Sequence, residues 1–142
     1  MNKLIKYISS QLKKPRGFGG VLVAIGQNII NRELYRAAAV EVDLDSCDKY
    51  LELGYGNGNL MKKLYKKKNV DMYGIDISED AKKMAGKRNK KAAANENLHL
   101  SVGDCCNLTY SENEFDAVAT INTVYFWSDT IKGLSEIYRV LK

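Results

Sequence analysis

The chain has 142 residues, of which 45% are hydrophobic and 27% are charged, a composition typical of one globular domain. A single proline and the lack of any long polar tract exclude a disordered protein. The net charge is +5, and half of the 22 lysines and arginines lie between Lys62 and Lys91. This run lacks an array of aromatic stacking platforms, so we interpret it as solvated helix faces rather than a nucleic-acid surface.

The three cysteines, Cys47, Cys105 and Cys106, do not have the spacing of metal ligands. The first residues, MNKLIKYISSQLKK, lack the apolar core of a secretion signal. The most apolar stretch, FGGVLVAIGQNII, is short and interrupted by glycine, which argues against a membrane span. The sequence therefore predicts a cytoplasmic protein with free thiols and no metal site.

The first part of the chain, residues 1–46, is predicted to be helical. Residues 2–13 carry apolar side chains at helical spacing, with lysines elsewhere, and predict an amphipathic helix. The segment KKPRGFGG interrupts it, because proline and glycine are loop signals. Residues 21–42 predict one or two further helices.

The rest, residues 47–142, alternates between strands and helices. Strands are predicted at 49–53, 70–77, 98–102 and 115–121, and helices at 59–68, after Ser78 and at 130–142. Ser78 is expected to cap its helix, because serine accepts the first free backbone N–H groups. This alternation predicts an α/β domain with a parallel sheet and helices on both faces. Right-handed crossovers place the first two core helices on the same face.

The first predicted strand runs into YLELGYGNGNL, in which Gly54, Gly56 and Gly58 occupy alternate positions. Ligands of parallel sheets bind beyond the carboxyl ends of the strands, and glycine lets the backbone approach a ligand closely. Two acids follow neighbouring strands: Asp76, where a carboxylate can accept bonds from both ribose hydroxyls, and Asp104, where one can accept a bond from adenine. Three such features at successive strand ends predict a nucleotide-type ligand.

That ligand is not predicted to be a dinucleotide. The dinucleotide pattern G-x-G-x-x-G requires glycine at the position that Asn59 occupies, which argues against an NAD-dependent oxidoreductase. A phosphate-binding loop of the form G-x-x-x-x-G-K-[ST] is also lacking. Glu52, just before the turn, would repel a pyrophosphate but suit a cationic amine.

These segments resemble the motifs of the class I S-adenosylmethionine (SAM) methyltransferases. YLELGYGNGNL resembles their first motif, YGIDIS the second, and SVGDCCNLTYSENEFDAVATINTVYFW the third and fourth strands, with Thr109 in place of the usual proline. Within this family, the motifs most resemble those of the small-molecule branch, which includes ubiquinone and menaquinone biosynthesis enzymes. The resemblance implies a Rossmann-like fold with strand order 3-2-1-4. Further strands follow EIYRVLK in the family, so we expect an incomplete fold, truncated after the fourth core strand.

The resemblance also implies roles for individual residues. Glu52 and the turn from Gly54 through Tyr55 and Gly56 to Gly58 would hold the methionine end of SAM. Asp76 would bind the ribose, Ile77 would pack on the adenine, and Asp104 with Cys105 would frame the adenine edge. Asn122 would stand where the methyl-transfer pocket begins. Tyr125, Phe126 and Trp127 either wall the acceptor site or pack against the last helix. His99, within the third strand, is interpreted as structural.

Three hypotheses follow for the function. The first is a methyltransferase that uses SAM, yields S-adenosylhomocysteine and acts on a small-molecule acceptor, with the N-terminal segment as a lid. The second is a SAM-binding module without catalysis. The third is an RNA-directed methyltransferase that uses the lysine-rich face. The fourth strand has an apolar outer edge that carries Phe115, Val118 and Ile121. We expect either self-association through this edge or its coverage by the chain's own N-terminal segment.

Overall fold

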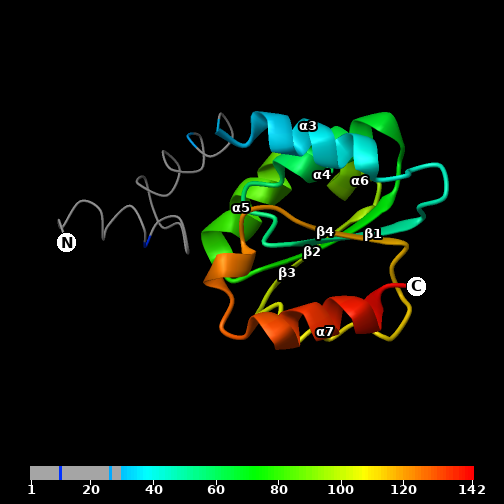
Figure 1. The fold of residues 1–142 in the computed structure, drawn as a ribbon. Helices are drawn as coiled ribbons and strands as arrows, with labels where there is room; N and C mark the ends of the chain where they lie inside the picture. Colours follow the sequence, from blue (N-terminus) through cyan, green and yellow to red (C-terminus); the bar gives the residue numbers. More distant parts are fainter. Residues whose placement is uncertain (1–9, 11–25, 27–29) are drawn as a thin grey trace.

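The computed structural model describes Ser10, Gly26 and residues 30–142. Apart from Ser10, the helix expected at residues 2–13 lies outside the described residues, as do the KKPRGFGG segment and most of residues 21–29. The described elements, labelled as in Figure 1, are α3 (Arg32–Glu41), β1 (Lys49–Leu53), α4 (Asn59–Lys67), β2 (Asp71–Asp76), α5 (Glu79–Arg88), α6 (Lys90–Ala94), β3 (Leu98–Val102), β4 (Ala117–Thr120), the 3-10 turn η1 (Val124–Phe126) and α7 (Thr130–Val140).

The four strands form one parallel sheet in the order β3-β2-β1-β4, which confirms the predicted α/β class and strand order. Leu51 at the centre of β1 pairs with Tyr73 of β2 on one side and with Val118 of β4 on the other. The chain leaves β1 toward β2 and later returns to the opposite side of β1 as β4. The strand order therefore reverses at β1, where parallel sheets bind their ligands.

Helices cover both faces of the sheet (Figure 1). On one face lie α4, α5 and α6, with α3 packed outside α4, around a core that includes Leu60, Met61 and Leu64. On the other face lies α7, over a core that includes Leu51, Phe115 and Val140. The expectation that the first two core helices share one face is confirmed, because successive right-handed crossovers run in the same direction.

Local sequence explains where the helices begin and end. Ser78 is the N-cap of α5, as predicted, and its hydroxyl accepts a hydrogen bond from the Ala81 N–H at 3.3 Å. Asn89 ends α5 and precedes α6 as a separate short helix. Its side-chain amide donates to the carbonyls of Gly58 and Ala85, both at 3.0 Å, so the break also fixes the start of α4.

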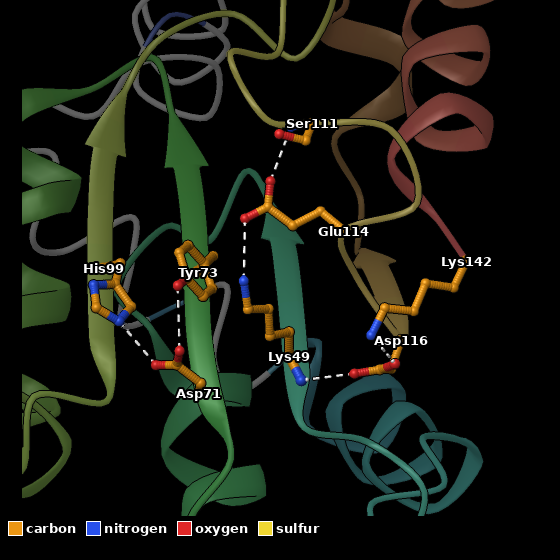
Figure 2. Close-up of polar contacts among 8 residues, drawn as sticks. All are labelled: Lys49, Asp71, Tyr73, His99, Ser111, Glu114, Asp116 and Lys142. Atoms are coloured by element: carbon orange, nitrogen blue, oxygen red, sulfur yellow. Dashed lines mark hydrogen bonds and ion pairs between the residues drawn. The ribbon is translucent and has the colours of Figure 1, made fainter.

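The amino ends of the strands are joined by polar contacts (Figure 2). Asp116 accepts hydrogen bonds from the backbone N–H groups of Asp48 and Lys49 and pairs with Lys142 at 2.7 Å. His99 lies at this edge, with Nε2 2.8 Å from an oxygen of Asp71, and its ring stacks on Tyr73. These contacts tie together the end of the sheet at which the strands begin, opposite to their carboxyl ends.

The predicted fourth strand, 115–121, is shorter in the structure. Its first residue, Phe115, pairs on its outer side with Leu141, through bonds to the Val140 carbonyl and the Lys142 N–H, both at 2.9 Å. The residues of β4 itself pair with β1 as their one strand neighbour among the described residues. No helix in the described part of the chain is long and apolar enough to cross a membrane.

Candidate functional site

A pocket of about 100 Å³ lies at the carboxyl ends of the strands, where the order reverses. Segments from across the described chain meet there: α3, the turn after β1, the ends of β2 and β3, and the chain after β4. The lining residues are Asn31, Tyr35, Gly54, Tyr55, Gly56, Asn57, Ile75, Asp76, Ile77, Gly103, Cys105, Ile121, Asn122, Thr123, Phe126 and Trp127.

The glycine turn has the backbone conformation that its sequence predicts. Gly54, Gly56 and Gly58 all have positive φ, at 69°, 52° and 70°. A Cβ atom on Gly54 would lie 2.4 Å from Cγ2 of Thr123, whereas one on Gly56 would meet no atom within 4 Å. Gly54 therefore allows the chain after β4 to pack closely against the turn, while Gly56 leaves open space at the pocket. Gly58, the N-cap of α4, does not line the pocket.

Asp76 connects this turn to the end of β2. One carboxylate oxygen accepts a hydrogen bond from the Gly56 N–H at 2.9 Å, and the other accepts one from the Ser78 N–H at 2.9 Å. The side chain lines the pocket, although the residue is only 9% exposed. Carboxylate oxygens are the acceptor groups that ligand hydroxyls bind, and each has two lone pairs.

Glu52 lies behind the pocket rather than in its wall. It is buried, and it accepts hydrogen bonds from the Tyr50 hydroxyl at 3.3 Å and from the backbone N–H of Met61. Burial, together with a smaller contribution from the negative charge of Asp76, raises the pKa of Glu52 to about 8. Glu52 does not line the pocket. The direct contact with a ligand that its position before the turn led us to expect therefore has no support in the geometry.

Asp104 and Cys105 mark the end of β3. Cys105 lines the pocket, whereas Asp104 is exposed at its rim and accepts bonds from the Cys106 N–H at 2.9 Å and the Ser128 hydroxyl at 3.3 Å. The hydrogen bond from Cys106 lowers the pKa of Asp104, so this carboxyl is ionised. Burial raises the pKa of Cys105 to about 12, so in the absence of a bound metal ion it is a protonated thiol.

The chain after β4 forms the wall opposite to β2. Asn122 has a positive φ of 55°, and its side-chain amide donates to Oδ1 of Asn31 at 2.7 Å. Tyr35, one turn further along α3, also lines the pocket, and burial raises its pKa. Sequence reasoning missed Asn31 and Tyr35 because only their place in the predicted lid segment pointed to them.

The aromatic residues after Asn122 have different positions. Phe126 and Trp127 line the pocket, and the Trp127 indole N–H donates to the Thr123 hydroxyl at 3.1 Å. Trp127 also covers Gly133 of α7, where a Cβ would lie 2.5 Å from the indole ring. Trp127 thus both lines the pocket and packs against the last helix. Tyr125, in contrast, is 68% exposed and does not line the pocket.

The electrostatic character of the pocket follows from these residues. Among its described lining residues, Asp76 is the only carboxylate, and there is no lysine, arginine or histidine. Polar groups on the α3 side are neutral amides and a phenol. Such a pocket suits a ligand that is neutral or cationic and carries hydroxyl groups for Asp76.

Comparison with known proteins identifies a family whose profile matches most of the chain. The profile of the family described as "Methyltransferase domain" matches residues 51–142. The uncharacterized methyltransferase YdaC of Bacillus subtilis is 31% identical over 113 residues, covering 79% of this chain and 60% of YdaC. A demethylmenaquinone methyltransferase of Bacteroides fragilis is 37% identical over 71 residues, covering 50% of this chain and 29% of the relative.

Solved structures agree in fold. A Methanococcus maripaludis protein assigned as an S-adenosyl-L-methionine-dependent methyltransferase superposes with a TM-score of 0.75 at 24% identity, covering 87% of this chain and 58% of that one. The [4+2]-cyclase SpnF superposes with a TM-score of 0.71 at 24% identity, covering 78% of this chain and 40% of SpnF. The chain therefore spans less than two thirds of the length of each of these relatives.

Proposed function

Because the chain belongs to the methyltransferase domain family, we propose that its pocket binds SAM and that it catalyses methyl transfer to a small-molecule acceptor. The observation that carries the proposal is the meeting of the glycine turn, Asp76 and Cys105 from three strand ends in one pocket. Relatives named as quinone-pathway methyltransferases support the acceptor class, since their acceptors are small molecules.

The residues present fit this cofactor. Asp76 would accept hydrogen bonds from the ribose hydroxyls, and Ile77 would pack against the adenine. The backbone of the turn around Gly56 would lie against the methionine end, where the open space beside Gly56 leaves room for it. Asp104 and Cys105 would frame the adenine edge. When bound, SAM supplies an electrophilic methyl group on a positively charged sulfonium. The carboxylate of Asp76 and the lack of cationic side chains among the lining residues would favour that positive charge.

The chain's own contribution to catalysis would be orientation and exclusion of water, which can lower a barrier substantially once the reacting atoms are aligned. Asn122, with Asn31 and Tyr35 beside it, would hydrogen-bond the acceptor. None of the described lining residues is an effective general base at neutral pH, because the one carboxylate would be engaged by the ribose and Tyr35 has a raised pKa. The acceptor would therefore be an intrinsically nucleophilic small molecule without negative charge.

Binding would require the pocket to open. Small-molecule sites usually have volumes of roughly 300–1,000 Å³, whereas this one has about 100 Å³. The wall formed by Asn31 and Tyr35 is the part that does not belong to the sheet or its loops, and a single amide contact joins Asn31 to Asn122. Movement of this wall would enlarge the pocket, consistent with the lid expected from the N-terminal segment.

Calorimetric titration with SAM, S-adenosylhomocysteine and NAD tests the cofactor assignment. We expect the first two to bind and NAD not to bind, and a melting temperature that rises with SAM, since a ligand at 100 times its Kd stabilises the fold by about 2.7 kcal/mol. Binding of NAD alone would refute the assignment. Transfer of labelled methyl groups to a panel of quinols and amines would then separate an enzyme from a SAM-binding module without catalysis.

A second acceptor class, RNA, is favoured by one observation. A hollow of about 680 Å³ between α4 and α6 is lined by eight lysines and arginines and by no carboxylate: Lys62, Lys66, Lys67, Lys68, Lys87, Arg88, Lys90 and Lys91. Solvated lysines would bind RNA weakly and lose it between about 50 and 200 mM salt. A complex that persists above this range, and that transfers methyl groups to the RNA, would replace the small-molecule proposal.

A further inference from the structure

The structure brings together three ligand atoms that the sequence pattern did not predict as a site. The carboxylate of Asp104 and the thiols of Cys105 and Cys106 have ligand atoms within 4.8 Å of one another. We propose that this cluster, the Asp104–Cys106 cluster, binds a thiophilic divalent cation such as Zn²⁺ or Cd²⁺. Two sulfur ligands and one oxygen suit borderline and soft metal ions, which prefer thiolate to all-oxygen sites.

The geometry is close to what such an ion needs. With Zn–S bonds of about 2.3 Å, two sulfurs of a tetrahedral site lie roughly 3.8 Å apart. The Asp104–Cys106 cluster would therefore contract by about 1 Å at most, which rotation of short thiol side chains can supply. Both thiols are buried, at 9% and 5% exposure, whereas Asp104 is exposed and Cys105 reaches the pocket. An ion would enter past Asp104 and be held away from bulk water.

Neighbouring groups support a fourth ligand position. The Ser128 hydroxyl lies 3.3 Å from one oxygen of Asp104 and 3.6 Å from Sγ of Cys106. The Cys106 thiol donates to the carbonyl of Asp129 at 3.1 Å, and the backbone N–H of Cys106 orients the other oxygen of Asp104. Water or the Ser128 hydroxyl would complete a tetrahedral set.

The step balances without an oxidant. Two thiols and one carboxylate bind M²⁺ through two new metal–sulfur bonds and one metal–oxygen bond, and the two thiol protons pass to solvent. The complex carries one negative charge, and the two released protons account for the rest of the initial charge of +1.

The cluster would also oppose cofactor binding, a consequence that rests on the proposed function. Asp104 and Cys105 are the residues expected to frame the adenine of SAM, and a carboxylate that coordinates a metal is no longer free to accept a bond from adenine. Thermodynamic linkage makes the effect reciprocal: metal would weaken SAM binding by the same factor by which SAM weakens metal binding.

Titration with Cd²⁺ tests the site directly, because cadmium thiolates absorb in the ultraviolet. We expect one Cd²⁺ per chain, with thiolate absorption, and at least a tenfold loss of affinity in Cys105→Ser and in Cys106→Ser. Cys47→Ser is the matched control, since Cys47 is also buried but lies in the core on the other face of the sheet. Asp104→Asn keeps both thiols and should also weaken binding, so a folding defect in one cysteine variant leaves the test intact.

Absent absorption, or equal absorption in the wild type and in both cysteine variants, would overturn the metal site. The second arm measures the Kd of S-adenosylhomocysteine with and without Cd²⁺. We expect the Kd to rise with Cd²⁺ in the wild type and to stay constant in Cys106→Ser. An unchanged wild-type Kd would refute the antagonism. Failure of S-adenosylhomocysteine to bind at all would refute the proposed function and leave the metal result standing.

Discussion

Substitution of Asp76 separates its observed role, holding the glycine turn, from its proposed role in binding the ribose. In the structure its two oxygens accept hydrogen bonds from the backbone N–H groups of Gly56 and Ser78, both at 2.9 Å. Asp76→Ala removes the acceptor from both donors, and the Ser78 donor lies in a buried residue. Asp76→Asn keeps one carbonyl oxygen and can satisfy one of the two donors.

The size of the effects follows from these bonds. A hydrogen bond to a charged group contributes about 1.5–3 kcal/mol. Gly56 lines the pocket, where water can replace part of its bond, so losing both bonds should lower the unfolding free energy of Asp76→Ala by less than the full sum, about 2–4 kcal/mol. A folded domain of ordinary stability survives this loss. If the carboxylate also accepts both ribose hydroxyls, SAM affinity should fall by a similar amount, about 30- to 700-fold. Asp76→Asn should show smaller losses of both quantities.

Urea unfolding gives the stability of each variant, and calorimetry at low temperature gives the Kd for S-adenosylhomocysteine on folded protein. Asp71→Asn is the matched control, because Asp71 lies at the opposite end of the same strand, beside His99. This substitution should leave the Kd unchanged. A folded Asp76→Ala variant that is less stable but binds S-adenosylhomocysteine as tightly as the wild type would refute the ribose role. Its carboxylate would then serve the turn and the helix start alone.

Three further predictions concern stability and assembly. Because the pKa of Glu52 is raised to about 8, the folded state keeps a proton that the unfolded chain releases above its ordinary carboxyl pKa. The unfolding free energy, measured by urea unfolding, should therefore fall as pH rises from about 4.5 to 8. Glu52→Gln should make this pH dependence weaker, and an equal pH dependence in the variant and the wild type would contradict the prediction. Gly54 has a φ of 69°, and a Cβ there would clash with the Thr123 side chain, so Gly54→Ala should lower the unfolding free energy by about 1–3 kcal/mol or more. Gly86→Ala, in open space within α5, should leave the unfolding free energy unchanged or raise it. Light scattering should show concentration-dependent association through the outer edge of β4, and a constant mass of 16.0 kDa would argue against it.

The sequence by itself determined the elements and the frame of the site. Alternating strand and helix patterns predicted a parallel sheet, and handed crossovers, which follow from backbone chirality, predicted the face that each helix covers. The glycine turn was predictable because positive φ is a local property of Gly54, Gly56 and Gly58. Asp76 was predictable because its place at a strand end depends only on the period of that strand.

The tertiary structure alone decided which side chains meet. Asn31 contacts Asn122 across 91 residues of sequence, and Glu52 lies behind the pocket because Tyr50 and Met61 hold its carboxyl inside the core. Phe115, predicted to begin the fourth strand, lies outside β4 and instead forms an isolated bridge with Leu141. These contacts depend on how helices and loops pack after the sheet has formed, and local periodicity carries no information about partners so distant in the sequence.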